Sequence, residues 1–140
     1  MLSQLRLNYN NLSCDLAELE QFVEFLNYES DGSIVVVEGK RDLEALRSIG
    51  FNGDVVVFHN FRGIGEFVHH LAIINRKIIL LLDMDRKGKV LTSKILKHLN
   101  SSCQHDYLQT KRRLAQITRG RIKHIEDLKS FSKDPCFNWF

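Results

Sequence analysis

Two aspartates and one glutamate, at the ends of two apolar runs, are the residues of this chain best suited to chemistry. Asp83 and Asp85 follow the apolar run Ile78–Leu82, and Glu38 follows the run Ile34–Val37. Because side chains alternate along an extended backbone, Asp83 and Asp85 are expected to point to the same side. Two carboxylates that close repel each other unless they share a proton or hold a cation. Mg²⁺ fits such a pair, since it leaves positions open for water and phosphate.

Lysines and arginines stand directly after these acids, where the next helices are expected to begin. They are Lys40, Arg41, Arg86, Lys87 and Lys89. The N-terminus of a helix already carries partial positive charge, so cations are unfavourable there unless a polyanion binds. Acids for a metal beside cations for phosphates predict a phosphodiester site. We interpret these cations as nucleic-acid contacts, with solvated surface as the alternative.

Each acid also has a purely structural explanation. Asp85 could cap the following helix, and Glu38 could pair with Lys40 or Arg41. A response-regulator receiver also has an aspartate at this edge of its sheet, but it requires an acidic pair after its first strand, where this chain has only Glu38. We therefore interpret Asp83 and Asp85 as metal ligands and Glu38 as a further acid of the same site.

Alternating strands and helices are expected to position these residues. The sequence predicts a helix at 15–28, strands at 33–38, 54–58 and 77–83, helices at 41–49, 64–75 and 88–100, and a short fourth strand near Cys103–Asp106. An unbroken apolar run such as Ile78–Leu82 is typical of a strand buried on both faces, usually at the centre of a parallel sheet. The pattern predicts an α/β fold with about four parallel strands flanked by helices. Open α/β sheets bind ligands at the carboxyl ends of their strands.

Length and charge divide the chain into parts. With 140 residues, 44% of them hydrophobic and 26% charged, one soluble globular domain is expected. Within it, 1–31 is an N-terminal helical segment, 32–106 the core, and 107–140 a basic segment of one or two helices broken near 118–120.

Charge is distributed unevenly between these parts. One cation, Arg6, precedes Gly32, whereas no acid lies between Tyr107 and Ile125. This asymmetry favours a nucleic-acid face on the second half, with head-to-tail self-association as the alternative. The basic residues expected to contribute to that face are Lys111, Arg112, Arg113, Arg119 and Arg121. A solvated helix face is the alternative for some of them, because Lys111, Arg112 and Arg113 cannot all share one face.

The cysteines and the N-terminus bear on the cellular compartment. Cys14, Cys103 and Cys136 form no C-x-x-C pair, so neither a zinc site nor a disulfide framework is expected. The N-terminus lacks the apolar run of a signal peptide, and no segment reaches membrane-spanning length. We therefore expect a cytoplasmic protein that does not bind membranes.

Two further features are expected to serve structure rather than chemistry. His69, His70 and His124 lack metal-ligand spacing and are expected at the surface or in the core. The C-terminal tail at 137–140 is expected to dock on the core or on a second subunit, with base stacking as the alternative.

The Glu-Gly pair at 38–39 and the Asp-x-Asp motif at 83–85, followed by Gly88, resemble the Toprim domain. This domain is shared by type IA and type II topoisomerases, bacterial-type primases, some nucleases and the ribonuclease that matures bacterial 5S ribosomal RNA. The stretch Val37–Asp42 looks most like the small stand-alone Toprim proteins and that ribonuclease. The resemblance covers about 32–106 and implies a Toprim, Rossmann-like fold.

The resemblance also implies roles for the acids and a cofactor. In the family the glutamate is a general acid or base and the Asp-x-Asp pair binds Mg²⁺, with Mn²⁺ as a substitute. These roles fall on Glu38, Asp83 and Asp85. The implied function is Mg²⁺-dependent processing of nucleic-acid phosphodiesters, foremost as a nuclease acting on RNA rather than DNA.

Missing motifs narrow this function without deciding whether the chain is an enzyme. The sequence lacks the tyrosine-bearing domains of a topoisomerase, the zinc module of a primase and the G-x-x-x-x-G-K-S/T loop of an ATPase. Cleavage and ligation of a phosphodiester use the same metal and the same in-line geometry, so the sequence does not distinguish these two reactions. A nucleic-acid or ribonucleoprotein binding module without turnover is the main alternative. A protein-interaction adaptor, favoured modestly by homodimer formation, is a weaker one.

Overall fold

The computed structural model describes residues 17–99 and 109–131. The expected fourth strand, the aromatic tail and all three cysteines lie outside these residues. The first helix is described over residues 17–29. It is followed by β1 (Ser33–Val37), α2 (Lys40–Ser48), β2 (Val55–Val57), the 3₁₀ helix η1 (Phe58–Asn60), α3 (Ile64–Ile74), β3 (Lys77–Leu80), α4 (Arg86–His98), α5 (Gln109–Ile117) and the 3₁₀ helix η3 (Ile125–Phe131).

The described strands form a parallel sheet in the order β2-β1-β3. Val36 of β1 lies opposite Val56 of β2 and Leu80 of β3. The expected α/β fold with a parallel, helix-flanked sheet is thus confirmed, with three strands in the described residues instead of about four. Connections through helices give this parallel arrangement.

The apolar run at 78–82 is not in a central strand of the described sheet. β1 lies in the middle, and β3 pairs with it on one side. The ladder of β3 ends at Leu80, although Leu81 still donates its N–H to Val36 O at 2.9 Å. The run is nevertheless buried throughout, because helices cover both of its faces. Packing of helices against both faces accounts for the unbroken apolar pattern within the described sheet.

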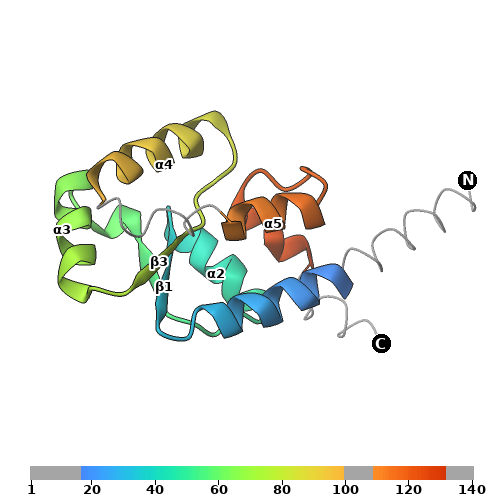
Figure 1. The fold of residues 1–140 in the computed structure, drawn as a ribbon. Coiled ribbons are helices and arrows are strands. Elements are labelled where there is room, and N and C mark those ends of the chain that lie inside the picture. The colour runs from blue at the N-terminus through green and yellow to red at the C-terminus, as the bar shows by residue number, and fades with distance from the viewer. Residues whose placement is uncertain (1–16, 100–108, 132–140) are drawn as a thin grey trace, which may run out of the picture.

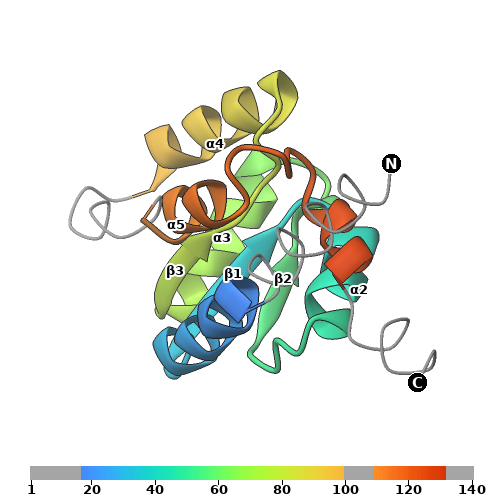
Figure 2. The ribbon, with the colours of Figure 1, turned by 90° about the vertical axis from the view of Figure 1, so that its right-hand side faces the viewer.

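Helices cover the sheet in two layers, and Figure 1 shows α3 and α4 on one side of the strands and α2 and α5 on the other. Side chains alternate along β1, so Ile34 and Val36 pack with Phe67 of α3 and Ile95 of α4. Val35 and Val37 face the opposite way, into a cluster built from the N-terminal helix, α2, α5 and η3. Figure 2 shows the same strands with these helices around them.

The C-terminal helical region is interrupted where the sequence predicts. α5 ends at Ile117, and the left-handed backbone of Arg119 (φ 54°) and Gly120 (φ 71°) turns the chain before η3. Glycine adopts this conformation without strain. Across the described ranges, none of the helices combines the length and the apolar character needed to cross a bilayer.

Candidate metal and nucleic-acid site

Glu38 and Asp83 lie at the same edge of the sheet because they follow neighbouring parallel strands. Glu38 comes directly after β1, and Asp83 comes three residues after β3. Together with Asp85 they line one cavity of about 440 Å³, which we call the acid cavity. Asp42 of α2 and Glu126 of η3 line it too. The structure therefore brings together the three acids that the sequence singled out and adds two that it did not.

The ionisation of Glu38 is disfavoured in this cavity. Burial raises the pKa of this carboxyl, and the negative charge of Asp83 raises it further. His59, whose Nε2 lies 3.7 Å from Glu38 Oε1, partly opposes this rise. A carboxylate with a raised pKa beside another carboxylate either keeps a proton or attracts a cation.

The two aspartates are held by hydrogen bonds from different elements. Asp83 Oδ1 accepts the Ile125 N–H at 2.8 Å, and Asp85 Oδ1 accepts the Gly88 N–H at 2.7 Å. The second bond makes Asp85 the N-cap of α4, as the structural alternative supposed. This N–H lowers the pKa of Asp85, which also lines the acid cavity. Capping and a place in the site therefore coexist in one residue.

His124 is part of the site, although the sequence assigned it no role there. Its Nε2 lies 3.0 Å from Asp85 Oδ2, and its Nδ1 lies 3.6 Å from Asp127 Oδ2. The contact with Asp85 raises the pKa of His124. His59 was missed in the same way. Neither contact has a spacing signal in the sequence, since His124 stands 39 residues from Asp85.

Residues 83–85, which we call the acid turn, are held in place by the segment Lys123–Ile125 and by α5. Met84, between the aspartates, donates its N–H to Lys123 O at 2.6 Å. Lys111 Nζ donates to Asp83 O at 3.1 Å. With the bonds from Ile125 and His124, the turn is tied to the C-terminal part of the chain at four points. The predicted basic segment is thus a structural part of the site.

Tight packing at Gly88 fixes the start of α4 against the acid turn. A Cβ atom on Gly88 would overlap the carbonyl oxygen of Asp83. At the other junction, Gly39 donates its N–H to Asp42 Oδ2 at 2.9 Å. Burial raises the pKa of Asp42, and the charges of Asp83 and Glu126 add to the rise. The acid cavity is therefore a crowded cluster of negative charge.

Three of the predicted cations line the acid cavity, and they are Lys40, Arg41 and Lys87. All three are exposed, so they can reach a bound phosphate. Arg86 is the first residue of α4, and it lines a neighbouring cavity of about 580 Å³ together with Lys87 and Lys94. These cations surround the carboxylates, as a phosphodiester site requires.

The remaining predicted cations lie elsewhere. Lys89, Lys111 and Arg112 line a separate cavity between α4 and α5. The guanidinium of Arg113 lies over the Phe25 ring, 4.3 Å from its centroid. Arg121 donates through Nε to Thr118 O at 3.2 Å, and Arg119 occupies the turn after α5. The basic segment thus does not present all its cations on one surface.

The donor chemistry of the acid cavity fits a hard cation. No group of three Asp, Glu, His or Cys side chains within 17–99 and 109–131 is already arranged to hold a metal ion. The repelling pair Glu38 and Asp83, however, offers oxygen ligands, and Mg²⁺ needs only one or two carboxylates besides water. Asp85 supplies a third carboxylate if the ion replaces its contact with His124.

Comparisons with known proteins agree with this fold. The model of the Toprim domain family matches residues 33–125. A protein named UPF0292 from Archaeoglobus fulgidus is 30% identical over 112 residues, covering 80% of this chain and 86% of its own. One from Thermococcus sibiricus is 36% identical over 111 residues, covering 79% and 84%. A solved structure from Aquifex aeolicus matches in fold with a TM-score of 0.62 at 24% identity, covering 76% of this chain and 94% of that one. The resemblance seen in the sequence is confirmed.

Proposed function

Because this chain belongs to the Toprim domain family, we propose that it is a Mg²⁺-dependent enzyme that cleaves nucleic-acid phosphodiesters, with RNA as its preferred substrate. Membership of the family indicates a metal-binding function related to nucleic acids. Cleavage and the preference for RNA are the finer proposal.

One observation carries the proposal: carboxylates from two neighbouring strands converge on a cavity rimmed by cations. Glu38, Asp83 and Asp85 line this cavity together with Lys40 and Lys87. Burial raises the pKa of Glu38, and the negative charge of Asp83 raises it further, so these two carboxylates lie close enough to act on each other. Such a cluster is suited to a metal and a phosphate at the same time.

The carboxylates of Asp83 and Asp85 would hold the metal, and Glu38 would either complete its ligand set or accept a proton. When bound, Mg²⁺ stabilises charge on the phosphate and lowers the pKa of a coordinated water. Ile125 and Gly88 fix the orientation of the two aspartates through backbone N–H groups. If either side chain rotated away from the cavity, its hydrogen bond would break. These bonds therefore keep the carboxylate oxygens in place for a cation.

Glu38 is the proposed proton acceptor. A general base works best when its pKa approaches the working pH, and burial together with Asp83 shifts the pKa of Glu38 in that direction. His59, whose Nε2 lies 3.7 Å from Glu38 Oε1, is exposed to solvent. Lys40, Arg41 and Lys87 would bind the phosphates on either side of the cleaved bond.

The test is a cleavage assay on end-labelled structured RNA, single-stranded DNA and duplex DNA, with Mg²⁺, Mn²⁺ or EDTA. Metal-dependent cleavage of RNA that disappears in Glu38→Gln and Asp83→Asn is the expected result. Glu24→Gln, an exposed acid on the N-terminal helix, is the matched control and should cleave normally. Binding without a metal-dependent product from any substrate would refute the enzyme.

A second candidate, a binding module without turnover, is favoured by the contacts of Asp85. Both of its carboxylate oxygens already have partners, in Gly88 and His124. A site that uses Asp85 for capping and ion pairing could bind a phosphate backbone through its cations alone. In that case the same assay shows salt-dependent binding that Glu38→Gln and Asp83→Asn leave unchanged.

A further inference from the structure

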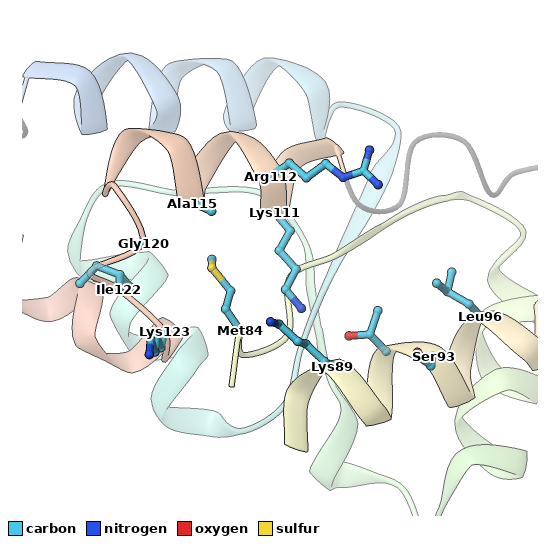
Figure 3. Close-up of a pocket in the computed structure, with 11 residues that line it drawn as sticks. Met84, Lys89, Ser93, Leu96, Lys111, Arg112, Ala115, Gly120, Ile122 and Lys123 are labelled. Carbon is cyan, nitrogen blue, oxygen red and sulfur yellow. The ribbon is translucent and has the colours of Figure 1, made fainter. Parts of the chain in front are cut away.

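A second cavity, of about 490 Å³, lies on the other side of the acid turn, between α4 and α5. We call it the basic pocket. Figure 3 shows Met84 reaching into it, with its side chain directed toward Ala115. Asp83 and Asp85 line the acid cavity, whereas Met84 between them lines the basic pocket. A turn of three residues therefore forms the wall between the two cavities.

Lysines from three parts of the chain meet at the basic pocket. Lys89 comes from α4, Lys111 from α5 and Lys123 from the segment before η3. Figure 3 shows the ammonium groups of Lys89 and Lys111 directed toward one another. Among the eleven described residues that line this pocket, none is acidic. Converging like charges without an acid in the lining make the pocket attractive to an anion.

The position of Lys111 strengthens this argument. Its Nζ donates to Asp83 O at 3.1 Å, so the ammonium group is held at the wall instead of extending into solvent. Its ammonium group also points toward that of Lys89, and a bound anion would relieve the repulsion between these two charges.

The rest of the lining is largely apolar. Met84, Ala115 and Ile122 contribute hydrocarbon and thioether surface. The volume lies within the range of small-molecule sites, about 300–1,000 Å³. A thioether makes favourable contacts with aromatic rings. The ligand that matches this lining has a flat apolar part and a negative charge.

We propose that the basic pocket binds one nucleotide unit, with the base against Met84 and the phosphate between Lys89 and Lys111. The inference rests on the proposed function, because it assigns the same nucleic-acid ligand a second contact. A free mononucleotide and a nucleotide within a bound strand have the same chemistry here. In a strand, the neighbouring phosphate would lie across the acid turn, at Asp83 and Asp85.

Methionine-methyl NMR tests this directly, because the chain has two methionines, Met1 and Met84. The ¹³C-methyl signal of Met84, assigned with Met84→Leu, is followed in EDTA during titration with AMP, adenosine or inorganic phosphate. We expect AMP to shift the signal saturably and the other two probes to shift it far less. An equal shift from phosphate alone would overturn the proposal, because a simple anion site would explain it.

Titration with a five-nucleotide RNA that lacks a terminal phosphate distinguishes a free mononucleotide from a nucleotide within a strand. A shift with AMP identifies a free mononucleotide as a ligand, and a shift with the RNA alone identifies a nucleotide within a strand. Either outcome supports the pocket. A Met84 signal that neither ligand moves overturns it.

Two matched pairs of variants locate the binding site. Ala115→Phe fills the pocket and should weaken AMP or RNA binding about tenfold or more, as loss of one stacked base does. Ala72→Phe, at an exposed position of α3, is its control. Lys89→Gln should also weaken binding, whereas Lys97→Gln, exposed in the last turn of α4, should not. Equal effects within a pair contradict the assignment.

The NMR titration of Met84 does not depend on turnover, so the pocket proposal and the nuclease proposal can fail independently. If Met84 responds but no substrate is cleaved, the nuclease proposal fails and the pocket stands. If RNA is cleaved but the Met84 signal does not move, the pocket is refuted and the nuclease stands.

Discussion

The two strand–helix junctions that supply the acids contain the same residue types in a different order. After β1 the capping carboxylate comes from inside the helix, where Asp42 accepts the Gly39 N–H. After β3 it comes from before the helix, where Asp85 accepts the Gly88 N–H. At the β1 junction, the acid that follows the strand is Glu38, whereas the acid that caps the helix is Asp42.

This difference gives the two junctions different electrostatic properties. With Asp42 as the cap, Glu38 faces the acid cavity, and burial raises its pKa. Asp85 both caps and lines the cavity, and the helix N–H lowers its pKa. The β1 junction is thus suited to accepting a proton and the β3 junction to holding permanent negative charge. Similar sequence patterns therefore need not have equivalent roles.

The largest expected effect comes from removing one charge at each junction. Glu38→Gln and Asp83→Asn should each lower cleavage on the order of a thousandfold, the scale of losing a general base. Folding should survive, because the amide oxygen in Asp83→Asn can still accept the Ile125 N–H. If Glu38 accepts the proton, the acid limb of the kcat/KM profile disappears in Glu38→Gln. An unchanged limb would assign proton transfer to another group.

The two glycines should differ next in size of effect. Gly88→Ala forces a Cβ onto the Asp83 carbonyl and should cost about 3 kcal/mol of unfolding free energy. In Gly39→Ala the nearest atom is Nδ1 of exposed His59 at 3.3 Å, and the residue has extended backbone, so the cost should stay below about 1 kcal/mol. Urea unfolding of both variants measures this contrast. Equal losses would show that the close packing at α4 does not matter.

The capping hydrogen bond of Asp42 should have a smaller effect on stability, and two variants separate this effect from that of its charge. Asp42→Ala leaves the Gly39 N–H without its acceptor and should cost about 1 kcal/mol. Asp42→Asn keeps an acceptor and removes a negative charge near Asp83, so stability should stay level or rise. Thermal unfolding of the pair decides the matter. A larger loss in Asp42→Asn than in Asp42→Ala would contradict the assignment.

The smallest effect concerns His124 and pH. Its folded pKa is raised above 6.5, so its protonated form stabilises the fold below that pH. That contribution is lost as pH rises through the folded pKa. The metal-free protein should therefore lose stability across about pH 6 to 8, and His124→Gln should flatten the slope. Urea unfolding across this range measures it. An identical slope in both proteins would refute the role of His124.

The sequence predicted the fold and the three central acids because both follow from local rules. Strand and helix periods identify the elements, and parallel strands bring Glu38 and Asp83 to one edge. The capping alternative for Asp85 was also correct. These predictions needed no knowledge of how distant helices pack.

Contacts across the chain could not be predicted. His124 meets Asp85 only because η3 packs on α2 and carries the preceding segment onto the acid turn. The sequence also favoured the run at 78–82 for the centre of the sheet, where the described sheet has β1, because burial by helices and burial by strands give the same apolar run. Lys111 and Lys89 converge because α4 and α5 line the same pocket, which sequence spacing does not encode.

The four bonds between the acid turn and the C-terminal region have a consequence for how this domain can be shortened. A fragment ending before α5 would keep the three described strands and all three central acids. It would lose the partners at Lys111, Lys123, His124 and Ile125 that hold the turn. Such a fragment retains every residue of the sequence signature but not the scaffold that orients the two aspartates. Motif content is therefore a poor guide to where this domain can be truncated.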